Sequence, residues 1–322
     1  MRRSIIGAVA GLLGLALAAC TPATEMKGAP SQAPTQSKQI ALFMTHMSNE
    51  FTIALSDSVK AQVEARGFEY KVYDANKDAE RQQTQIEQAV NLGVGAIIIE
   101  PVSVDGVVPA VRQAASKGTN VVIVNQRISE PSLAKAYVGA DAVKTGRILM
   151  EQVVKDLGSG GELALLLGPM GSDGQIGRSA GFKEVMDANQ GFKTAFEASA
   201  NWETAPALST VENWLNSGKT INAVVSQNDG MAIGAAQAVA AAGKTGEIKV
   251  YGVDATSEGL QAVLDGKLAA TVGQGTQEQG KKAADAAADL IEGKTVPAET
   301  IVENVVYTKA NAAEALAALK SK

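Results

Sequence analysis

Polar side chains suited to ligand binding follow the apolar runs that predict strands, or lie near the start of the next helix. They are amides, carboxylates and arginines, together with one phenylalanine and one tryptophan. A sugar hydroxyl donates and accepts hydrogen bonds at once, and these polar groups satisfy both roles with fixed geometry. The apolar C–H faces of a sugar ring lie well on an aromatic plane. This mixture favours a hydroxyl-rich ligand. The candidate residues are Asn49, Phe51, Asn125, Gln126, Arg127, Arg178, Trp202, Asn228, Asp254 and Gln274.

Each of these residues also has an ordinary structural explanation. An Asn or Asp after a strand is commonly a helix N-cap, which is the role expected for Asp141 and at least in part for Asp229. Asp254 suits a turn, Trp202 suits the core, and Arg178 suits a solvated helix face. The shared placement of these residues at strand exits, rather than any one of them, predicts a site.

Strands and helices alternate from Gln39 onward. Short runs that are apolar throughout predict strands covered on both faces, and βαβ repetition makes their sheets parallel. The expected strands span 40–44, 70–73, 96–99, 121–124, 137–138, 163–167, 194–197, 223–226, 249–253 and 269–272. The expected helices span 51–66, 79–92, 104–117, 142–157, 178–188, 207–215, 231–242, 258–264 and 277–290.

The number of strands is too large for one compact sheet. A length of 322 residues suggests about two domains at ~150 residues each. Two successive doubly wound α/β units, over about 40–140 and 141–274, fit this length. Ligands of such sheets bind beyond the C-terminal ends of the strands, which is where the candidate residues stand.

Composition excludes several classes of function. A net charge of −5 is of the wrong sign for a general nucleic-acid binder. One Cys and one His exclude a disulfide framework, a Cys/His zinc site and a Cys–His nucleophile pair within the chain. The glycines of 158–161 precede a strand, so they indicate a turn rather than a phosphate-binding loop. The sequence predicts no enzyme, no cofactor and no metal.

The N-terminus has the pattern of an export signal. Arg2 and Arg3 precede an apolar run over 5–19, too short for a membrane-spanning helix. The run ends in Leu-Ala-Ala-Cys and looks like a bacterial lipobox with Cys20 as the lipidated residue, although an ordinary signal peptide with an incidental Cys is the alternative. Residues 21–38 are rich in Pro, Ser, Thr and Gln, which indicates a flexible tether. We expect an exported protein in the periplasm or at the cell surface, held to the membrane by lipid alone.

Four motifs resemble those of the ribose-binding-protein-like family of periplasmic sugar receptors, which serve bacterial ABC importers. The similarity runs from Gln39 to Tyr307, and the motifs are QNDGMAIG (227–234), YGVDAT (251–256), GKLAATV (266–272) and RSAGF (178–182). The resemblance implies two Rossmann-like lobes joined by three crossovers near 140–141, 274–275 and 303–304. The chain then divides into a signal peptide (1–19), a lipidated Cys with tether (20–38), an N-terminal lobe (39–140 plus 275–303) and a C-terminal lobe (141–274 plus 304–322).

The resemblance also implies which lobe contributes each ligand contact. It implies first-lobe contacts from Asn49 and Phe51, and it implies second-lobe contacts from Arg178, Trp202, Asn228, Asp254 and Gln274. The chain departs from the family pattern in two places. Thr52 stands where a second Phe would sandwich the sugar ring, and the run 125–127 (Asn-Gln-Arg) replaces an Asp-Arg pair. A lost charge-assisted bond is worth about 1.5–3 kcal/mol, so "sugar or polyol" is a better expectation than ribose.

The resemblance implies a monomer that delivers a monosaccharide or polyol to an ABC permease. The alternative, which the sequence leaves open, is a sugar receptor that signals to a membrane sensor or chemoreceptor instead of feeding transport. The same fold serves sugar-responsive repressors, but these carry an N-terminal helix-turn-helix where this chain has an export signal. A hydrolase lacks support because the chain has no G-x-S-x-G elbow and its lone His46 has no identifiable partner.

Replacement of either charged second-lobe residue tests the predicted site. Asp254→Ala or Arg178→Ala is expected to abolish sugar binding while the fold stays intact, because each change leaves ligand hydroxyls unpaired. Calorimetric titration of both variants measures this, and near-normal affinity in both would contradict the assignment.

Overall fold

The computed structural model describes residues 37–320. The expected signal peptide, Cys20 and almost all of the expected tether lie outside this range. Within it, no helix has the length and apolar character needed to cross a bilayer.

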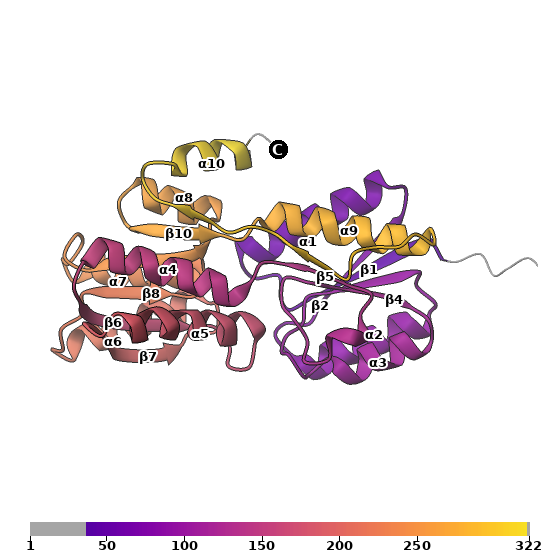
Figure 1. Cartoon of the computed structure of the whole chain (residues 1–322), viewed down its shortest axis with the longest axis horizontal. Helices are drawn as coiled ribbons and strands as arrows, with labels where there is room; N and C mark the ends of the chain where they lie inside the picture. Colours follow the sequence, from indigo (N-terminus) through magenta and orange to yellow (C-terminus); the bar gives the residue numbers. More distant parts are fainter. Residues whose placement is uncertain (1–36, 321–322) are drawn as a thin grey trace, which may run out of the picture. The chain divides into compact units, whose positions relative to one another are not determined.

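The first sheet has six strands in the order β11-β5-β4-β3-β1-β2, and all neighbours are parallel. Helices α1 and α9 lie side by side on one face, and α2 and α3 cover the other (Figure 1). The bounds are β1 (Gln39–Met44), α1 (Glu50–Ala65), β2 (Glu69–Asp74), α2 (Ala79–Asn91), β3 (Ala96–Ile99), α3 (Val108–Ser116), β4 (Asn120–Val124), β5 (Ala136–Gly139), α9 (Thr276–Ile291) and β11 (Glu299–Ile301), with a 3₁₀ turn at Pro131–Leu133.

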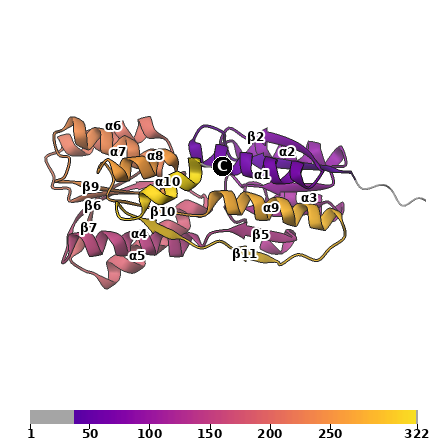
Figure 2. The same ribbon diagram turned by 90° about the horizontal axis from the view of Figure 1, so that it is seen from above.

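The second sheet also has six strands, in the order β12-β10-β9-β8-β6-β7, with β12 antiparallel to β10 and the rest parallel. Helices α4 and α5 cover one face, and α6, α7, α8 and α10 cover the other, with α10 against α8 (Figure 2). The bounds are α4 (Ala142–Leu157), β6 (Gly161–Leu167), α5 (Asp173–Ala188), β7 (Phe192–Ser199), α6 (Thr204–Asn216), β8 (Ala223–Ser226), α7 (Asp229–Ala241), β9 (Lys249–Asp254), α8 (Ser257–Leu264), β10 (Ala270–Gly273), β12 (Val305–Tyr307) and α10 (Ala312–Lys320).

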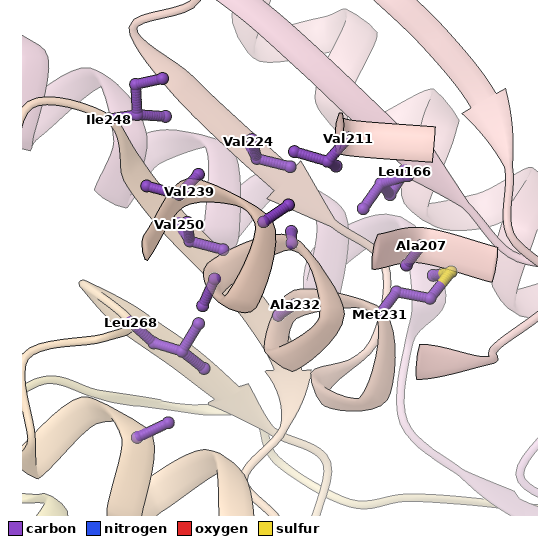
Figure 3. Packing of buried hydrophobic residues seen from close by; sticks show 14 of the residues in the cluster. Leu166, Ala207, Val211, Val224, Met231, Ala232, Val239, Ile248, Val250 and Leu268 are labelled. Atoms are coloured by element: carbon purple, nitrogen blue, oxygen red, sulfur yellow. The ribbon is translucent and has the colours of Figure 1, made fainter. Parts of the chain in front are cut away.

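The expected architecture of two doubly wound parallel sheets is confirmed. The central strands carry no polar alternation because helices cover both of their faces, and all four residues of β3 are buried. The core around α7 is built mainly from small and branched side chains such as Ala232 and Val239, together with the unbranched Met231 (Figure 3). This packing fixes the N-terminus of α7, where a candidate site residue stands.

Three C-terminal elements differ from the expected alternation. Strands β11 and β12 have three residues each and are largely half-buried or exposed, so neither forms the apolar run that predicts a strand. Helix α10 is alanine-rich and buries only Ala312 and Leu316, which gives a weak helical period. The chain passes between the sheets after β5, after β10 and between β11 and β12. We propose that these crossings divide the chain into an N-terminal lobe (39–140 plus 275–303) and a C-terminal lobe (141–274 plus 304–322).

Four helix starts also differ by two residues or more. Helix α3 begins at Val108 rather than 104, and α6 begins at Thr204 rather than 207. Helix α5 begins well before the expected 178–188, because Ser172 accepts a hydrogen bond from Gln175 N–H and caps it. Glycines in its first turns hide the period. The N-cap of α7 is Asn228 rather than Asp229, whose carboxylate instead accepts bonds from Thr271 and Thr256. Asp141 is confirmed as the N-cap of α4.

Candidate functional site

A cavity lies where the C-terminal ends of strands from both sheets face each other. It holds about 480 Å³ of empty space including its open mouth. Ten of the eleven residues proposed from the sequence line it, and Arg127 is the exception. The ten are Asn49, Phe51, Thr52, Asn125, Gln126, Arg178, Trp202, Asn228, Asp254 and Gln274. Their role in binding stays a prediction.

Two of the lining amides also cap helices. Asn49 Oδ1 accepts hydrogen bonds from Thr52 N–H and Oγ1–H, both at 3.0 Å, at the start of α1. Asn228 Oδ1 accepts from Met231 N–H at 2.9 Å at the start of α7. Capping uses the side-chain oxygen, which leaves the amide N–H groups for a ligand. One N–H of Asn228 already donates to the Trp202 carbonyl at 3.3 Å, so its second N–H is the one available to a ligand. The capping explanation and the binding explanation of these residues are therefore compatible.

A chain of hydrogen bonds joins the charged groups of the second lobe. Arg178 Nη2 donates to Gln274 Oε1 at 2.8 Å, and Gln274 Nε2 donates to Asp254 Oδ1 at 2.7 Å. Arg178 Nη1 donates to the Gln227 carbonyl. Burial lowers the pKa of Arg178 and raises that of Asp254 well above its ordinary value, while the attraction between the two opposes both shifts. Gln274 thus bridges the Arg178 guanidinium and the Asp254 carboxyl group at one wall of the cavity by a hydrogen bond to each.

Two buried polar atoms of the cavity lack a partner within residues 37–320. They are Arg178 Nε and Gln126 Oε1, one donor and one acceptor. An unpaired buried polar group costs about 1–3 kcal/mol, so each is a position where a ligand hydroxyl would be stabilising.

Aromatic side chains approach the cavity from both lobes. Phe51 lines it from α1 and is only 6% exposed. Trp202 lines it from the loop after β7, with the Arg178 guanidinium 5.4 Å from its ring centroid. A Cβ at Gly168 would lie 2.1 Å from the Trp202 ring, so glycine is required there for the indole to lie over the end of β6. Trp202 packs against the hydrophobic core of the second lobe as well, so the core explanation and the place at the cavity hold together.

Three of the seven non-glycine residues with positive φ in the described part of the chain line the cavity. They are Asn125 (φ 61°), Trp202 (φ 66°) and Asp254 (φ 123°). Such conformations cost of order 1–3 kcal/mol each and cluster at functional sites. Asp254 is the last residue of β9, and the other two come shortly after β4 and β7.

Arg127 lies outside the cavity wall. Its guanidinium pairs with Glu299 of β11 and lies 3.9 Å from the centroid of the Tyr137 ring. Tyr137 Oη donates to the Asn125 carbonyl at 2.9 Å and so supports the left-handed turn there. Because of that turn, the side chains of Asn125 and Gln126 line the cavity while that of Arg127 does not.

Sequence reasoning missed Glu100, Asp173, Thr45 and His46, which also line the cavity. Glu100 directly follows β3, so the rule of strand exits could have found it. Asp173 was hidden by the late helix start, and Thr45 and His46 directly follow β1. Burial, and secondarily the charge of Lys77, lowers the pKa of His46 to about 4, so its ring is neutral near pH 7.

Residues 40–295 match the family model of the periplasmic binding protein domain. The chain belongs to the periplasmic binding protein family. A xylitol-binding protein of Mycolicibacterium smegmatis is 34% identical over 96% of this chain and 86% of its own length. The ribose import binding protein of Bacillus subtilis is 31% identical over 87% and 90%. An ABC transporter solute-binding protein of Bacillus halodurans, solved with myo-inositol, superposes with a TM-score of 0.85 at 31% identity, covering 89% of this chain and 99% of its own. The relatives are binding proteins, and this chain is not an enzyme.

The two lobes of this periplasmic binding protein also bond each other directly at the rim of the cavity. Glu50 of α1 accepts hydrogen bonds from Ser257 N–H at 2.7 Å and Glu258 N–H at 3.1 Å, at the N-terminus of α8. Lys77 pairs with Glu203 and donates to the Asn201 carbonyl at 3.2 Å. These bonds hold the lobes together without contacting the cavity interior.

Loss of the Glu50 contact is expected to weaken ligand binding indirectly. A carboxylate at a helix N-terminus contributes about 0.3–1 kcal/mol, and up to ~2 kcal/mol when partly buried. We expect Glu50→Ala to raise the Kd of the best ligand by about 3- to 30-fold in calorimetric titration, because the closed arrangement becomes less stable. Glu80→Ala is the matched control, since Glu80 is an exposed acid in the first turn of α2. Equal Kd values for the two variants would contradict the role of Glu50.

Proposed function

We propose that this protein captures a monosaccharide or polyol between its lobes, outside the cytoplasmic membrane, and delivers it to an ABC permease. The observation that carries the proposal is the cavity itself, whose walls present amides, acids and an arginine together with Phe51 and Trp202. This is the mixture of fixed donors, acceptors and aromatic faces that a ring or chain of hydroxyl groups requires.

The relatives support the same ligand class. The names of the matched proteins include xylitol and ribose, and the solved structures hold myo-inositol and, in a protein of Actinobacillus succinogenes at 29% identity, D-allose. These ligands differ in ring form but share a high density of hydroxyl groups. The proposal therefore names pentoses, hexoses, inositols and linear polyols as one class.

Both lobes contribute residues to the cavity, so a bound ligand would favour closure of the lobes. Asn49, Phe51 and Gln126 belong to the first lobe, whereas Arg178 and Asp254 belong to the second. A ligand that contacts both sets favours the closed arrangement, because those contacts are lost when the lobes part. Hinge closure of this kind would present a two-lobe surface to the permease.

A thermal-shift screen against pentoses, hexoses, inositols and linear polyols tests ligand capture. At 100-fold excess over Kd, a ligand adds about 2.7 kcal/mol to the free energy of unfolding, which raises the melting temperature by several degrees. We expect at least one member of the panel to do this and to bind with unit stoichiometry in calorimetry. A panel without any stabilising member would contradict the proposal, as would turnover of a bound sugar.

Signalling is a second candidate function. The fructose-binding periplasmic domain of a hybrid two-component system superposes with a TM-score of 0.82 at 28% identity, covering 88% of this chain. A chain of this fold can thus belong to a sensor as well as to a transporter.

Membrane attachment and partner choice can be tested together. If Cys20 carries lipid, the wild-type protein is expected in the membrane fraction and Cys20→Ser in the soluble exported fraction. Pull-down from solubilised membranes in the presence of ligand then identifies the partner. Capture of an ABC permease supports transport, whereas capture of a sensor kinase or chemoreceptor supports signalling. Equal fractionation of both forms would contradict the lipid anchor.

A further inference from the structure

The charged groups that line the cavity are unequal in number. Glu100, Asp173 and Asp254 are acids, and Arg178 is the one strongly basic side chain among the lining residues that the structure describes. His46 lines the same cavity, but its lowered pKa leaves it neutral near pH 7. With all three carboxylates ionised, the lining would carry an excess of negative charge.

Two of the three acids have an arginine near them. Asp254 is attracted by Arg178, to which Gln274 also links it by hydrogen bonds. Asp173 is attracted by Arg178 and also by Arg127 from behind the cavity wall. The excess charge therefore falls on the remaining acid, Glu100.

Glu100 is surrounded by neutral groups. Its side chain is 1% exposed and accepts hydrogen bonds from Thr45 N–H (3.3 Å), Thr45 Oγ1–H (2.8 Å) and Asn125 Nδ2–H (2.7 Å). The first two bonds end on Oε2 and the third on Oε1. Over residues 37–320 this carboxylate takes part in no ion pair. Burial raises the pKa of this carboxyl, because an ionised buried carboxylate without a cation is costly, and the hydrogen bonds from Thr45 and Asn125 oppose that rise.

The hydrogen bonds leave room for one more donor. A carboxylate has about four acceptor positions, and Oε1 of Glu100 uses one of its two for Asn125. The residue lines the cavity, so a group of the ligand is placed to take the remaining position. A neutral hydroxyl would supply a hydrogen bond there without a counter-charge, whereas an ammonium group would supply both and would favour the ionised form of Glu100.

The described part of the first lobe supplies no arginine to Glu100. By resemblance, the family carries an Asp-Arg pair at the exit of β4, where this chain has Asn125, Gln126 and Arg127. Here the Asn125 amide donates a hydrogen bond to Glu100. Arg127 pairs with Glu299 of β11 and does not line the cavity.

We propose that the physiological ligand is an aminated polyol or amino sugar whose ammonium group pairs with Glu100. This inference rests on the proposed function, because it names the chemistry of one position of the ligand held in the same cavity. The amides, Arg178 and the aromatic faces bind the hydroxyl-bearing remainder, and Glu100 selects the charged substituent.

Calorimetric titration with scyllo-inositol and its monoamine, scyllo-inosamine, tests the proposal. All six carbons of scyllo-inositol are equivalent, so one monoamine covers every placement of the ammonium group around the ring. We expect the wild-type protein to bind the amine at least about 10-fold more tightly than the neutral parent, as for a charge-assisted hydrogen bond. In Glu100→Gln this preference should disappear, so that the ratio of the two Kd values falls to about 1 whatever the change in the Kd of the parent. If the protein accepts neither compound, the same comparison uses the best ligand of the sugar panel and its monoamino derivatives.

Asp173→Asn is the matched control, because it removes a cavity carboxylate that has arginines near it. We expect this variant to keep the preference for the amine. If the wild-type protein binds a neutral polyol as tightly as its amine, or more tightly, the inference is wrong while the proposed function stands. An amine preference that survives in Glu100→Gln would also overturn it. Failure of every neutral and aminated compound to bind would overturn the proposed function together with the inference.

Discussion

The buried guanidinium of Arg178 is the group around which the site is built. A buried charge must be hydrogen-bonded, and Arg178 is served by oxygens of Gln274 and Gln227, which stand beyond different strands of one sheet. Its starting point is fixed as well, since a Cβ at Gly146 would lie 2.3 Å from the Arg178 carbonyl, so α4 and α5 pack in close contact. The helix pair is therefore constrained by the backbone of Arg178, and the two strand exits and the crossover after β10 by its side chain.

In the first lobe, the buried polar group that must be hydrogen-bonded is the carboxyl group of Glu100. Glu100 is held by Thr45 and Asn125, both at strand exits, and the left-handed turn at Asn125 is supported by the Tyr137 hydroxyl. In both lobes the protein satisfies most of the polar groups that it buries and leaves a few atoms for the ligand. Binding thus completes hydrogen bonds that the folded chain has already positioned, and most of the ordering cost is met on folding.

Much of the fold and of the site could be predicted because both follow local rules. Fully apolar strands such as β3 require cover on both faces, and polar residues beyond parallel strands meet at one edge. The rest depends on tertiary geometry. Asn125 is of a type that tolerates left-handed backbone, but nothing local shows that a turn there places Gln126 at the cavity and Arg127 away from it. The hydrogen bond that joins Glu100 to Asn125 likewise has no local sequence signal. The short, half-exposed β11 and β12 are defined by their partners rather than by their own residues.

The central claim is that a polyhydroxylated ligand completes the hydrogen bonds of facing polar groups from both lobes. A crystal structure of the protein with the tightest-binding compound tests it most directly. The account predicts electron density in the cavity, with ligand atoms within hydrogen-bond distance of Arg178 Nε and Gln126 Oε1, the two buried atoms that lack partners within residues 37–320. Density for the ligand at another place on the protein, with both atoms still unpaired, would contradict it.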